Sequence, residues 1–459
     1  MSMIPDGGGK ANWANQTVWT GDNLAIMRGM NSESVDLIYL DPPFNSNRHY
    51  EAPIGSKAAG AAFKDAWTLD DVDVCEHGEL ADRNPAAYSV IEAARQAHGK
   101  GMQSYLIFMA VRLLEMRRVL KETGSIYLHC DDAAGHWLGV LMDGIFGAAQ
   151  QRNEIIWRRY GSHNDSRRYG RVHDTLLYYS RDRQWTWNGA WLPHDPAYVA
   201  QAYRHEDGRG RYRTAPLHTG GLQGGGYEYE FKGFSRTWRY PLERMLELER
   251  EGRIRQAKGG TGIPERKVYL ADSKGRPAPD IWDDVKALTG QNAERTGYPT
   301  QKPLALLDRI IRASSNPGDM VLDPFCGCAT ALVAADRLQR EWAGIDLSPL
   351  AIKLVDERIA ADRGDMPWGG AITPDGPPLR TDLGDLPNYR THRHRLYGEQ
   401  EGVCAGCETH FPFRVMDVDH MLPKSRGGTD HPDNLQLLCS GCNRSKGTKT
   451  MAEWRASGT

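Results

Sequence analysis

Apolar residues gather in short runs and helical repeats along the chain, and their order predicts an open α/β sheet. Five of the six residues at 35–40 are apolar or aromatic, which is typical of a strand buried on both faces of a parallel sheet. A short strand over 18–22 and a helix over 23–30 precede this run. Apolar residues over 105–120 recur at helical spacing, and 125–130 form another buried run. Strands that alternate with helices in this way favour the α/β class.

The same pattern returns in the second half of the chain. A helix over 304–314 leads to strands over 320–323 and 342–345. Between these strands lies a loop of small residues that opens a helix. Its Gly327 lets the backbone approach a ligand, while helix N-terminal amides point into the same space. We therefore predict an α/β fold, a doubly wound sheet that binds its ligands at the carboxyl ends of the strands.

Changes in composition along the chain predict several domains. Residues 1–16 form a polar leader, residues 46–100 carry few periodic signals and predict a partly irregular insertion, and the Pro/Gly-rich residues 361–388 predict a semi-extended linker. The predicted division is a flexible leader at 1–16, a catalytic part at 17–150, an inserted region at 151–290, a second α/β part at 291–360, the linker at 361–388 and a small module at 389–459.

The charge of the chain is nearly balanced, with a formal net charge of −2 over 459 residues. A nucleic-acid binder of this composition has to concentrate its positive charge locally. Residues 152–213 do so, with 12 arginines, no lysine and interleaved tyrosines and tryptophans, against seven acidic residues. Arginine suits phosphates and guanine edges, and aromatic rings add stacking surface for bases. We interpret this window as a nucleic-acid-contacting region. The alternative is a solvated basic region with scattered core aromatics.

The chain has no run of 18 apolar residues, and its first ten residues lack the apolar centre of a signal peptide. We therefore expect a soluble, cytoplasmic protein with no membrane partner. Four of the eight cysteines form two Cys-x-x-Cys pairs, Cys404 with Cys407 and Cys439 with Cys442. Four thiolates predict a structural, tetrahedral Zn²⁺ site. Such a site contributes about 10–16 kcal/mol, which a module of this size needs because its core is small.

Acidic residues follow the predicted strands where a ligand is expected. The run 35–40 stops at Asp41-Pro42-Pro43-Phe44, because two prolines cannot continue a strand ladder. Asp346 lies about twenty residues beyond the loop that follows Asp323. This spacing suits hydrogen bonds to ribose hydroxyls. These positions predict a nucleoside-bearing cofactor, with an ordinary turn as the alternative for each.

Four motifs together resemble the beta group of S-adenosylmethionine-dependent DNA amino-methyltransferases over residues 17–360. They are Gly21-Asp22, the Asp-Pro-Pro-Phe motif at 41–44, the segment 299–303, and the loop 323–327. The order of these motifs, with the arginine-rich region between them, is similar to that group. The resemblance implies a Rossmann-like methyltransferase sheet with a target-recognition region inserted at 151–290. It also implies double-stranded DNA as partner and S-adenosyl-L-methionine as cofactor.

The resemblance also implies a role for each motif residue. Asp41 and the carbonyl of Pro42 would accept the two N–H groups of the target amine, and Phe44, beyond Pro43, would stack on the flipped base. An acid at the first motif position favours adenine N6 over cytosine N4. The implied cofactor-binding residues are Asp22, Thr300, Lys302, Asp323, Pro324, Phe325, Gly327 and Asp346. Ala329 departs from the family, which has a second glycine there. We expect this change to cost little if the position is helical, with weaker or shifted cofactor affinity at most.

The C-terminal module resembles an HNH endonuclease, a ββα-metal fold. The resemblance implies that His420 is the general base, that Asp419 and Asn443 hold Mg²⁺ or a similar divalent ion, and that Asn434 fixes the His420 loop. The alternative is a non-catalytic, zinc-stabilised DNA-binding module.

We therefore expect a bifunctional enzyme of the modification and restriction type, encoded by a bacterium or a phage. It would methylate DNA adenine at N6 and carry an HNH nuclease. The alternatives are a cytosine-N4 methyltransferase with a non-catalytic module, a regulatory DNA-binding protein with vestigial sites, and an enzyme that acts on RNA. The oligomeric state stays open, although a homodimer would suit a palindromic site.

Overall fold

The computed structural model describes residues 9–43, 48–51, 62–65, 80–81, 83–161, 167–219, 225–289, 292–298, 300–383, 388–426 and 428–457. The chain divides into two compact units. One comprises residues 1–188 and 280–459, and the other comprises residues 189–279.

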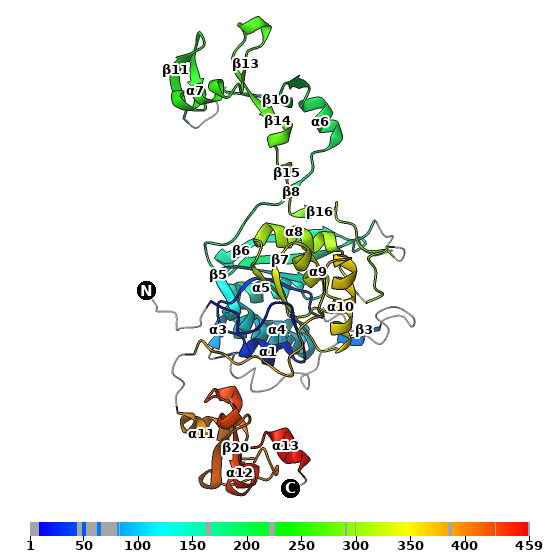
Figure 1. Cartoon of the computed structure of the whole chain (residues 1–459), viewed down its shortest axis with the longest axis vertical. Coiled ribbons are helices and arrows are strands. Elements are labelled where there is room, and N and C mark those ends of the chain that lie inside the picture. The colour runs from blue at the N-terminus through cyan, green and yellow to red at the C-terminus, as the bar shows by residue number, and fades with distance from the viewer. Residues whose placement is uncertain are drawn as a thin grey trace. The chain divides into compact units, whose positions relative to one another are not determined.

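The first unit contains an eight-stranded sheet with the strand order β1-β18-β17-β2-β5-β7-β6-β16. Figure 1 labels β5, β6, β7 and β16 of this sheet. The strands from β1 to β5 in this order pair in parallel, β7 runs antiparallel to both neighbours, and β16 is parallel to β6. The bounds are β1 (Thr17–Thr20), β2 (Val35–Leu40), β5 (Leu120–Cys130), β6 (Gln151–Arg158), β7 (His173–Ser180), β16 (Ile281–Trp282), β17 (Met320–Asp323) and β18 (Glu341–Asp346). The predicted α/β class is confirmed.

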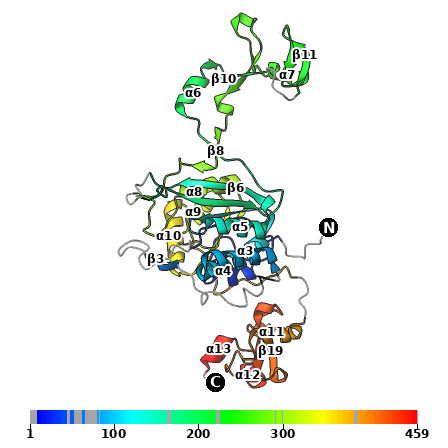
Figure 2. The same ribbon diagram turned by 180° about the vertical axis from the view of Figure 1, so that it is seen from behind.

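Helices cover both faces of this sheet (Figure 2). Alternation along the strands sends Ile38 and Leu322 to one face and Leu37 and Val321 to the other. The first face packs against α1 (Asn23–Gly29), α3 (Pro85–His98), α4 (Lys100–Val119) and α5 (Gly135–Phe146), and the second against α8 (Leu304–Ser314), α9 (Thr330–Arg337) and α10 (Leu350–Arg363). The central strands β2 and β17 are therefore buried on both sides, as the run at 35–40 predicted.

Part of the stretch 46–100, expected to be partly irregular, forms the regular helix α3. Asn84 caps this helix by accepting a hydrogen bond from the amide of Ala87 at 2.9 Å, and Pro85 takes the first position. Ala87, Ile91 and Ala94 are buried at helical spacing. Alanines carry a weak apolar signal, which is why the periodicity was inconspicuous. The strands β3 (Arg48–Glu51) and β4 (Ala62–Asp65) pair in a hairpin, and most of the remaining stretch lies outside the described residues.

Much of the expected linker is packed against the sheet and is not a free spacer. We call residues 371–382 the strap. Its Ile372 accepts a hydrogen bond from the Val18 amide at 2.8 Å and donates one to the Gln16 carbonyl at 2.9 Å. Further along, Asp382 accepts a hydrogen bond from the Ser32 amide at 2.8 Å and pairs with Arg380 at 2.8 Å. The strap therefore belongs to the sheet domain.

The second half of the expected flexible leader is also held in place. The side chain of Asn12 donates to the Gly29 carbonyl at 2.9 Å and to the Leu379 carbonyl of the strap at 2.7 Å. The amide of Gln16 donates to the Trp342 carbonyl at 2.9 Å. Residues 9–16 are thus clamped between the sheet edge and the strap, while residues 1–8 lie outside the described residues.

The second unit has its own sheet, with the strand order β13-β14-β10-β9, and an apolar cluster centred on Trp238. Its elements are β8 (Trp191–Leu192), α6 (Pro196–Ala202), β9 (His205–Asp207), β10 (Gly210–Pro216), β11 (Tyr227–Phe231), β12 (Phe234–Trp238), α7 (Leu242–Arg250), β13 (Ile254–Arg255), β14 (Glu265–Tyr269) and β15 (Arg276–Pro277). This unit is smaller than the predicted insertion at 151–290, because β6, β7 and β16 belong to the main sheet.

The C-terminal module is a small ββα arrangement. It contains α11 (Arg393–Glu399), β19 (Met416–His420), β20 (Leu435–Cys439), α12 (Ser440–Lys446) and α13 (Met451–Ala456), and β19 and β20 pair antiparallel. Its buried apolar cluster includes Leu396, Met416 and Leu437 together with Cys404 and Cys439. Across the described residues of the whole chain, no helix combines the length and apolar character that a membrane span requires.

The strap predicts a pH-dependent contribution to stability. Burial opposes the charge on Asp382, but the hydrogen bonds from Arg380 and Ser32 outweigh it and lower the pKa of Asp382 below its usual range. A depressed folded-state pKa stabilises the fold above the unfolded value of about 4, and this contribution is lost as the pH falls. We expect Asp382→Asn to lower the free energy of unfolding by about 1–3 kcal/mol at pH 7. The loss should shrink as the pH falls below about 4.

Urea unfolding followed by tryptophan fluorescence at pH 7 and at lower pH measures this difference. Asp375→Asn, an exposed position in the same strap, is the matched control and should change little. Equal stability of the Asp382→Asn variant and the wild type at pH 7 would contradict the assignment.

Candidate active sites at the sheet edge and in the ββα module

Asp41 lies directly after β2 and faces a lysine from a distant part of the chain. Its Oδ2 accepts a hydrogen bond from Lys302 Nζ at 2.5 Å, and both side chains are largely buried. Its Oδ1 is buried and has no hydrogen-bond partner among the described residues. A buried carboxylate oxygen without a donor is uncommon in a folded protein, which marks Oδ1 as an acceptor reserved for a ligand. The next residue, Pro42, is buried, Pro43 is partly exposed, and Phe44 lies outside the described residues.

Two further carboxylates stand at the same edge, because β17 and β18 run parallel to β2. Asp323 is buried, and one of its oxygens accepts a hydrogen bond from the Phe325 amide at 3.1 Å. Burial, and then the negative charges of Asp41 and Asp346, raise the pKa of Asp323 well above its usual range. The Asp346 oxygens accept hydrogen bonds from the amides of Gly327 and Ser348, each at 2.8 Å, and burial raises its pKa as well. The edge therefore gathers three carboxyl groups, and a cationic ligand would favour the ionised forms of Asp323 and Asp346.

The loop between β17 and α9 has the backbone that a close ligand contact requires. Gly327 has a φ of +47°, and a Cβ there would lie 3.0 Å from the ring of Tyr298. Ala329 also has a left-handed backbone, with a φ of +65° at the N-cap of α9. The expectation of a small cost assumed a helical backbone at this position, and that assumption is wrong. A left-handed alanine costs about 1–2 kcal/mol, which the buried loop sustains.

Asp22 is the N-cap of α1 and is partly exposed. Its Oδ1 accepts a hydrogen bond from the Leu24 amide at 3.1 Å and pairs with Arg112 at 2.7 Å. Arg112 also donates to the side chain of Asn23 at 2.7 Å and lies over the ring of Phe108 at 3.6 Å. Asn23 in turn donates to the carbonyl of Pro324 at 2.8 Å, and this bond ties α1 to the loop after β17. Arg112 was not predicted, because its helix shows only core periodicity.

A buried polar chain behind Asp41 was also missed. The hydroxyl of Tyr39 lies 3.0 Å from His129 Nδ1, and His129 Nε2 lies 2.9 Å from Asp174 Oδ2. Arg159 pairs with the same carboxylate at 2.8 Å. Burial opposes the charge on Asp174, but His129 and Arg159 together lower its pKa. The sequence did not mark this chain of residues, because β5 and β7 each contain several polar residues besides His129 and Asp174.

Several arginines expected to contact nucleic acid instead support the fold. Arg152 donates to Ser180 at 2.7 Å and stacks on Trp185 at 3.6 Å. Arg159 neutralises Asp174, and Arg181 pairs with Glu33 at 2.7 Å. At least these three arginines of the window 152–213 therefore have structural contacts.

In the C-terminal module, His420 ends β19 and faces a carboxylate that sequence reasoning missed. His420 Nε2 lies 2.7 Å from Asp430 Oδ1, which also pairs with Lys424 at 2.6 Å. The side chain of Asn434 accepts from the Leu422 amide at 2.8 Å and donates to the carbonyls of Leu422 and Thr429 at 3.0 and 2.9 Å. Asn434 thus bonds to Leu422 and to Thr429, and Asp430, the partner of His420, directly follows Thr429.

Asp419 is engaged by residues on the neighbouring strand and helix. Gln436 donates to its Oδ2 at 2.8 Å, and the fully buried ammonium of Lys446 lies 3.0 Å from the same oxygen. Lys446 also donates to the His420 carbonyl at 2.8 Å. The remaining lone pairs of Asp419 and the side-chain oxygen of Asn443 are the hard oxygen ligands that Mg²⁺ prefers. These oxygens are of the type that binds a divalent ion, and Lys446 already balances part of the Asp419 charge.

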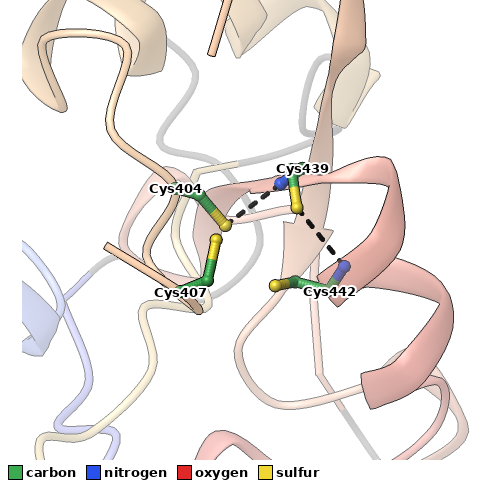
Figure 3. A group of neighbouring side chains, drawn as sticks. All are labelled: Cys404, Cys407, Cys439 and Cys442. Atoms are coloured by element: carbon green, nitrogen blue, oxygen red, sulfur yellow. Dashed lines mark hydrogen bonds between the residues drawn. The ribbon is translucent and has the colours of Figure 1, made fainter. Parts of the chain in front are cut away.

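The four predicted zinc ligands converge in the same module (Figure 3). The sulfurs of Cys404, Cys407, Cys439 and Cys442 all lie within 4.8 Å of one another. Backbone amides stabilise the sulfurs: the Cys439 amide donates to Cys404 Sγ at 3.1 Å, and the Cys442 amide donates to Cys439 Sγ at 3.4 Å. Zinc holds thiolates at about 2.3 Å, so a small contraction of this cluster would complete a tetrahedral site.

Comparison with known proteins gives two family matches. A family model described as DNA methylase matches residues 35–357, and one described as HNH endonuclease matches residues 404–449.

Curated relatives match the larger region. The chain is 34% identical over 358 residues to the type II methyltransferase M.EcaI of Enterobacter cloacae, covering 77% of this chain and 71% of that protein. It is 30% identical over 352 residues to the Mod subunit of the type III restriction-modification enzyme StyLTI of Salmonella typhimurium, covering 71% of this chain and 50% of the subunit. It is 25% identical over 346 residues to the DNA adenine methyltransferase YhdJ of Escherichia coli, covering 75% and 82% of the two chains.

Among solved structures, TTHA0409 from Thermus thermophilus in complex with S-adenosyl-L-methionine is 17% identical. The match covers 79% of this chain and 98% of that one, with a TM-score of 0.39.

The cysteine cluster predicts one zinc ion per chain. Cys407→Ser should lower the zinc content measured by atomic emission and unfold the module, because one thiolate is lost from an exposed position where packing changes little. Cys130→Ala, a buried cysteine of the sheet domain, is the control and should keep its zinc. Unchanged zinc content in the Cys407→Ser protein would contradict the four-thiolate site.

Proposed function

The chain belongs to the DNA methylase family over residues 35–357 and carries an HNH endonuclease domain over residues 404–449, and from this premise we propose that it methylates adenine N6 in duplex DNA and cuts DNA with the C-terminal domain. The family and the HNH domain were both predicted from the sequence, and both are confirmed. The observation that carries the proposed methylation is the buried Oδ1 of Asp41 at the sheet edge, which has no hydrogen-bond partner in the described part of the chain.

The residues at this edge fit S-adenosyl-L-methionine. The Gly327 loop offers a close backbone approach, and each Asp346 oxygen has a second lone pair for a ribose hydroxyl. The negative charge of Asp323 and Asp346 complements a cationic ligand. When bound, the cofactor would supply a methyl group on a sulfonium. We assign Asp22, Thr300, Pro324 and Phe325 to the surroundings of this pocket, as predicted from the resemblance.

Asp41 would act on the target amine. Its Oδ1 would accept one N–H and the Pro42 carbonyl the other, which directs the nitrogen lone pair toward the methyl group. Methylation would leave the amine nitrogen with a surplus proton. Asp41 Oδ1, which would accept a hydrogen bond from that nitrogen, would be placed to take the proton. Phe44 would stack on the flipped base.

Adenine is favoured over cytosine by the acid at the first motif position and by the name of one relative, the DNA adenine methyltransferase YhdJ. The relatives M.EcaI and the StyLTI Mod subunit, named as a type II methyltransferase and as part of a type III restriction-modification enzyme, place the proposal in a modification and restriction context.

For the nuclease, His420 would take a proton from the attacking water, with Asp430 orienting the imidazole. Asp419 and Asn443 would hold a divalent ion against the scissile phosphate, and Asn434 would keep the loop in place.

Long-read sequencing of DNA from cells that express the wild type or Asp41→Ala tests the methylation. We expect modified adenine in one sequence context with the wild type and a loss of about 100-fold or more in rate with Asp41→Ala, because a transition-state contact is removed. Asp375→Asn is the control and should modify as the wild type does. Modified cytosine at N4 would establish the alternative specificity, and preferential modification of RNA in a competition assay would redirect the proposal to RNA.

Metal-dependent nicking of plasmid DNA by the purified chain tests the nuclease. We expect His420→Ala to reduce nicking by about 10²–10⁴-fold, since a general base is lost. Its methylation should persist as evidence of folding, and His410→Ala, an exposed histidine of the same module, should nick normally. Undiminished nicking by the His420→Ala protein would favour the non-catalytic DNA-binding module.

A further inference from the structure

Lys302 was expected to bind the cofactor, but its contacts point toward Asp41. Its Nζ lies 2.5 Å from Asp41 Oδ2 and 3.3 Å from the Thr300 carbonyl, and its side chain is 6% exposed. The Thr300 backbone has a φ of +61°, a left-handed conformation that is strained for a β-branched residue. In this conformation the Thr300 carbonyl accepts a hydrogen bond from the Lys302 ammonium.

Three carboxyl groups share the buried edge at which Asp41 stands. Asp323 on β17 and Asp346 on β18 are the other two, and burial together with the charges of Asp41 and Asp346 raises the pKa of Asp323. Lys302 is the only lysine or arginine of the described residues that forms an ion pair with Asp41. Asp41 also interacts electrostatically with Tyr39 on β2, His129 and Cys130 on β5, Arg159 after β6, Tyr298, and Cys328 in the loop after β17.

The same contact fixes which oxygen is left for a ligand. With Oδ2 held by Lys302, the carboxylate cannot rotate freely, and Oδ1 is left without a hydrogen-bond partner among the described residues. Oδ1 is therefore the oxygen of Asp41 that can accept an N–H of the amine.

We propose that Lys302 is a positioning residue for Asp41 and not a ligand of the cofactor: its ammonium holds Oδ2 of the carboxylate and leaves Oδ1 to accept an N–H of the target amine. The inference rests on the proposed methyltransferase function and gives Lys302 a role in the same site. Because the inference gives Lys302 no part in cofactor binding, a measurement of cofactor affinity tests it as well as an activity assay.

The test compares Lys302→Met and Lys302→Arg with the wild type, using the full chain and a duplex that carries the modified context identified by sequencing. Lys121→Met is the matched control, because Lys121 pairs with Asp36 at 2.7 Å at the opposite end of the same strand β2. Calorimetry measures the Kd for S-adenosyl-L-methionine, and steady-state assays measure kcat and KM.

We expect Lys302→Met to lower kcat about tenfold or more while the Kd for S-adenosyl-L-methionine changes by less than about threefold. Lys302→Arg should recover part of the rate at neutral pH, and Lys121→Met should match the wild type in all of these measurements.

A Kd raised tenfold or more in Lys302→Met, with kcat preserved at saturating cofactor, would overturn the inference and return Lys302 to the cofactor pocket. A wild type that binds the cofactor but methylates no base would instead be a failure of the proposed function.

A stability cycle keeps the inference testable if Lys302→Met folds poorly. The Tm of Lys302→Met should fall below that of Asp41→Asn/Lys302→Met, because the neutral amide no longer needs the cation. If the double variant loses the sum of the two single losses, the two side chains act independently and the inference fails.

Discussion

The parallel pairing of β2 with β17 is the constraint on which the rest of the sheet edge depends. The register joins Val321 to Leu37 and Leu322 to Ile38, although some 280 residues of chain separate the two strands. Because side chains alternate along a strand, a slip of one residue would exchange the faces of β17 and move Asp323 away from Asp41. Both faces are apolar and packed against helices, so the core on each side opposes such a slip. The register therefore aligns Asp41 with the loop after β17, where we propose that the target amine and the cofactor meet.

This arrangement explains how the fold carries large additions without disturbing the edge. The inserted unit at 189–279 leaves the sheet domain after β7 and returns at β16, an edge strand far from β2 in the strand order. At the opposite edge, the strap hydrogen-bonds to β1 and holds residues 9–16 against it. Both additions are attached at or near sheet edges, and the catalytic strands stay central. Central strands are the ones whose register is determined by two neighbours instead of one.

The sequence was sufficient where a residue's role follows from its place in a local pattern. Asp41, Asp323 and Asp346 each end an apolar run, and parallel strands must bring such ends to one edge. The four cysteines carry their own spacing rule. The missed residues have partners that are far away in the chain: Arg112 reaches Asp22, His129 reaches Asp174, and Lys446 reaches Asp419. No local period marks such pairs, because only the folded register brings their atoms together. Ala329 was misjudged for a related reason, since its left-handed backbone is set by the loop and not by its own preference.

Different interactions hold the two proposed catalytic centres in place. At the sheet edge, burial and the neighbouring carboxylates disfavour further negative charge, and Lys302 forms an ion pair with Asp41. In the ββα module the apolar cluster is small, and two of its members are cysteines of the proposed zinc site. Lys446 on α12 reaches both Asp419 and the His420 carbonyl on β19, and α12 also carries Cys442 and Asn443. Metal binding at the cysteines would therefore fix the helix that supplies Asn443 and Lys446 to the nuclease site. Because the sheet domain lacks this dependence, removal of zinc would act on the nuclease centre and leave the edge around Asp41 formed.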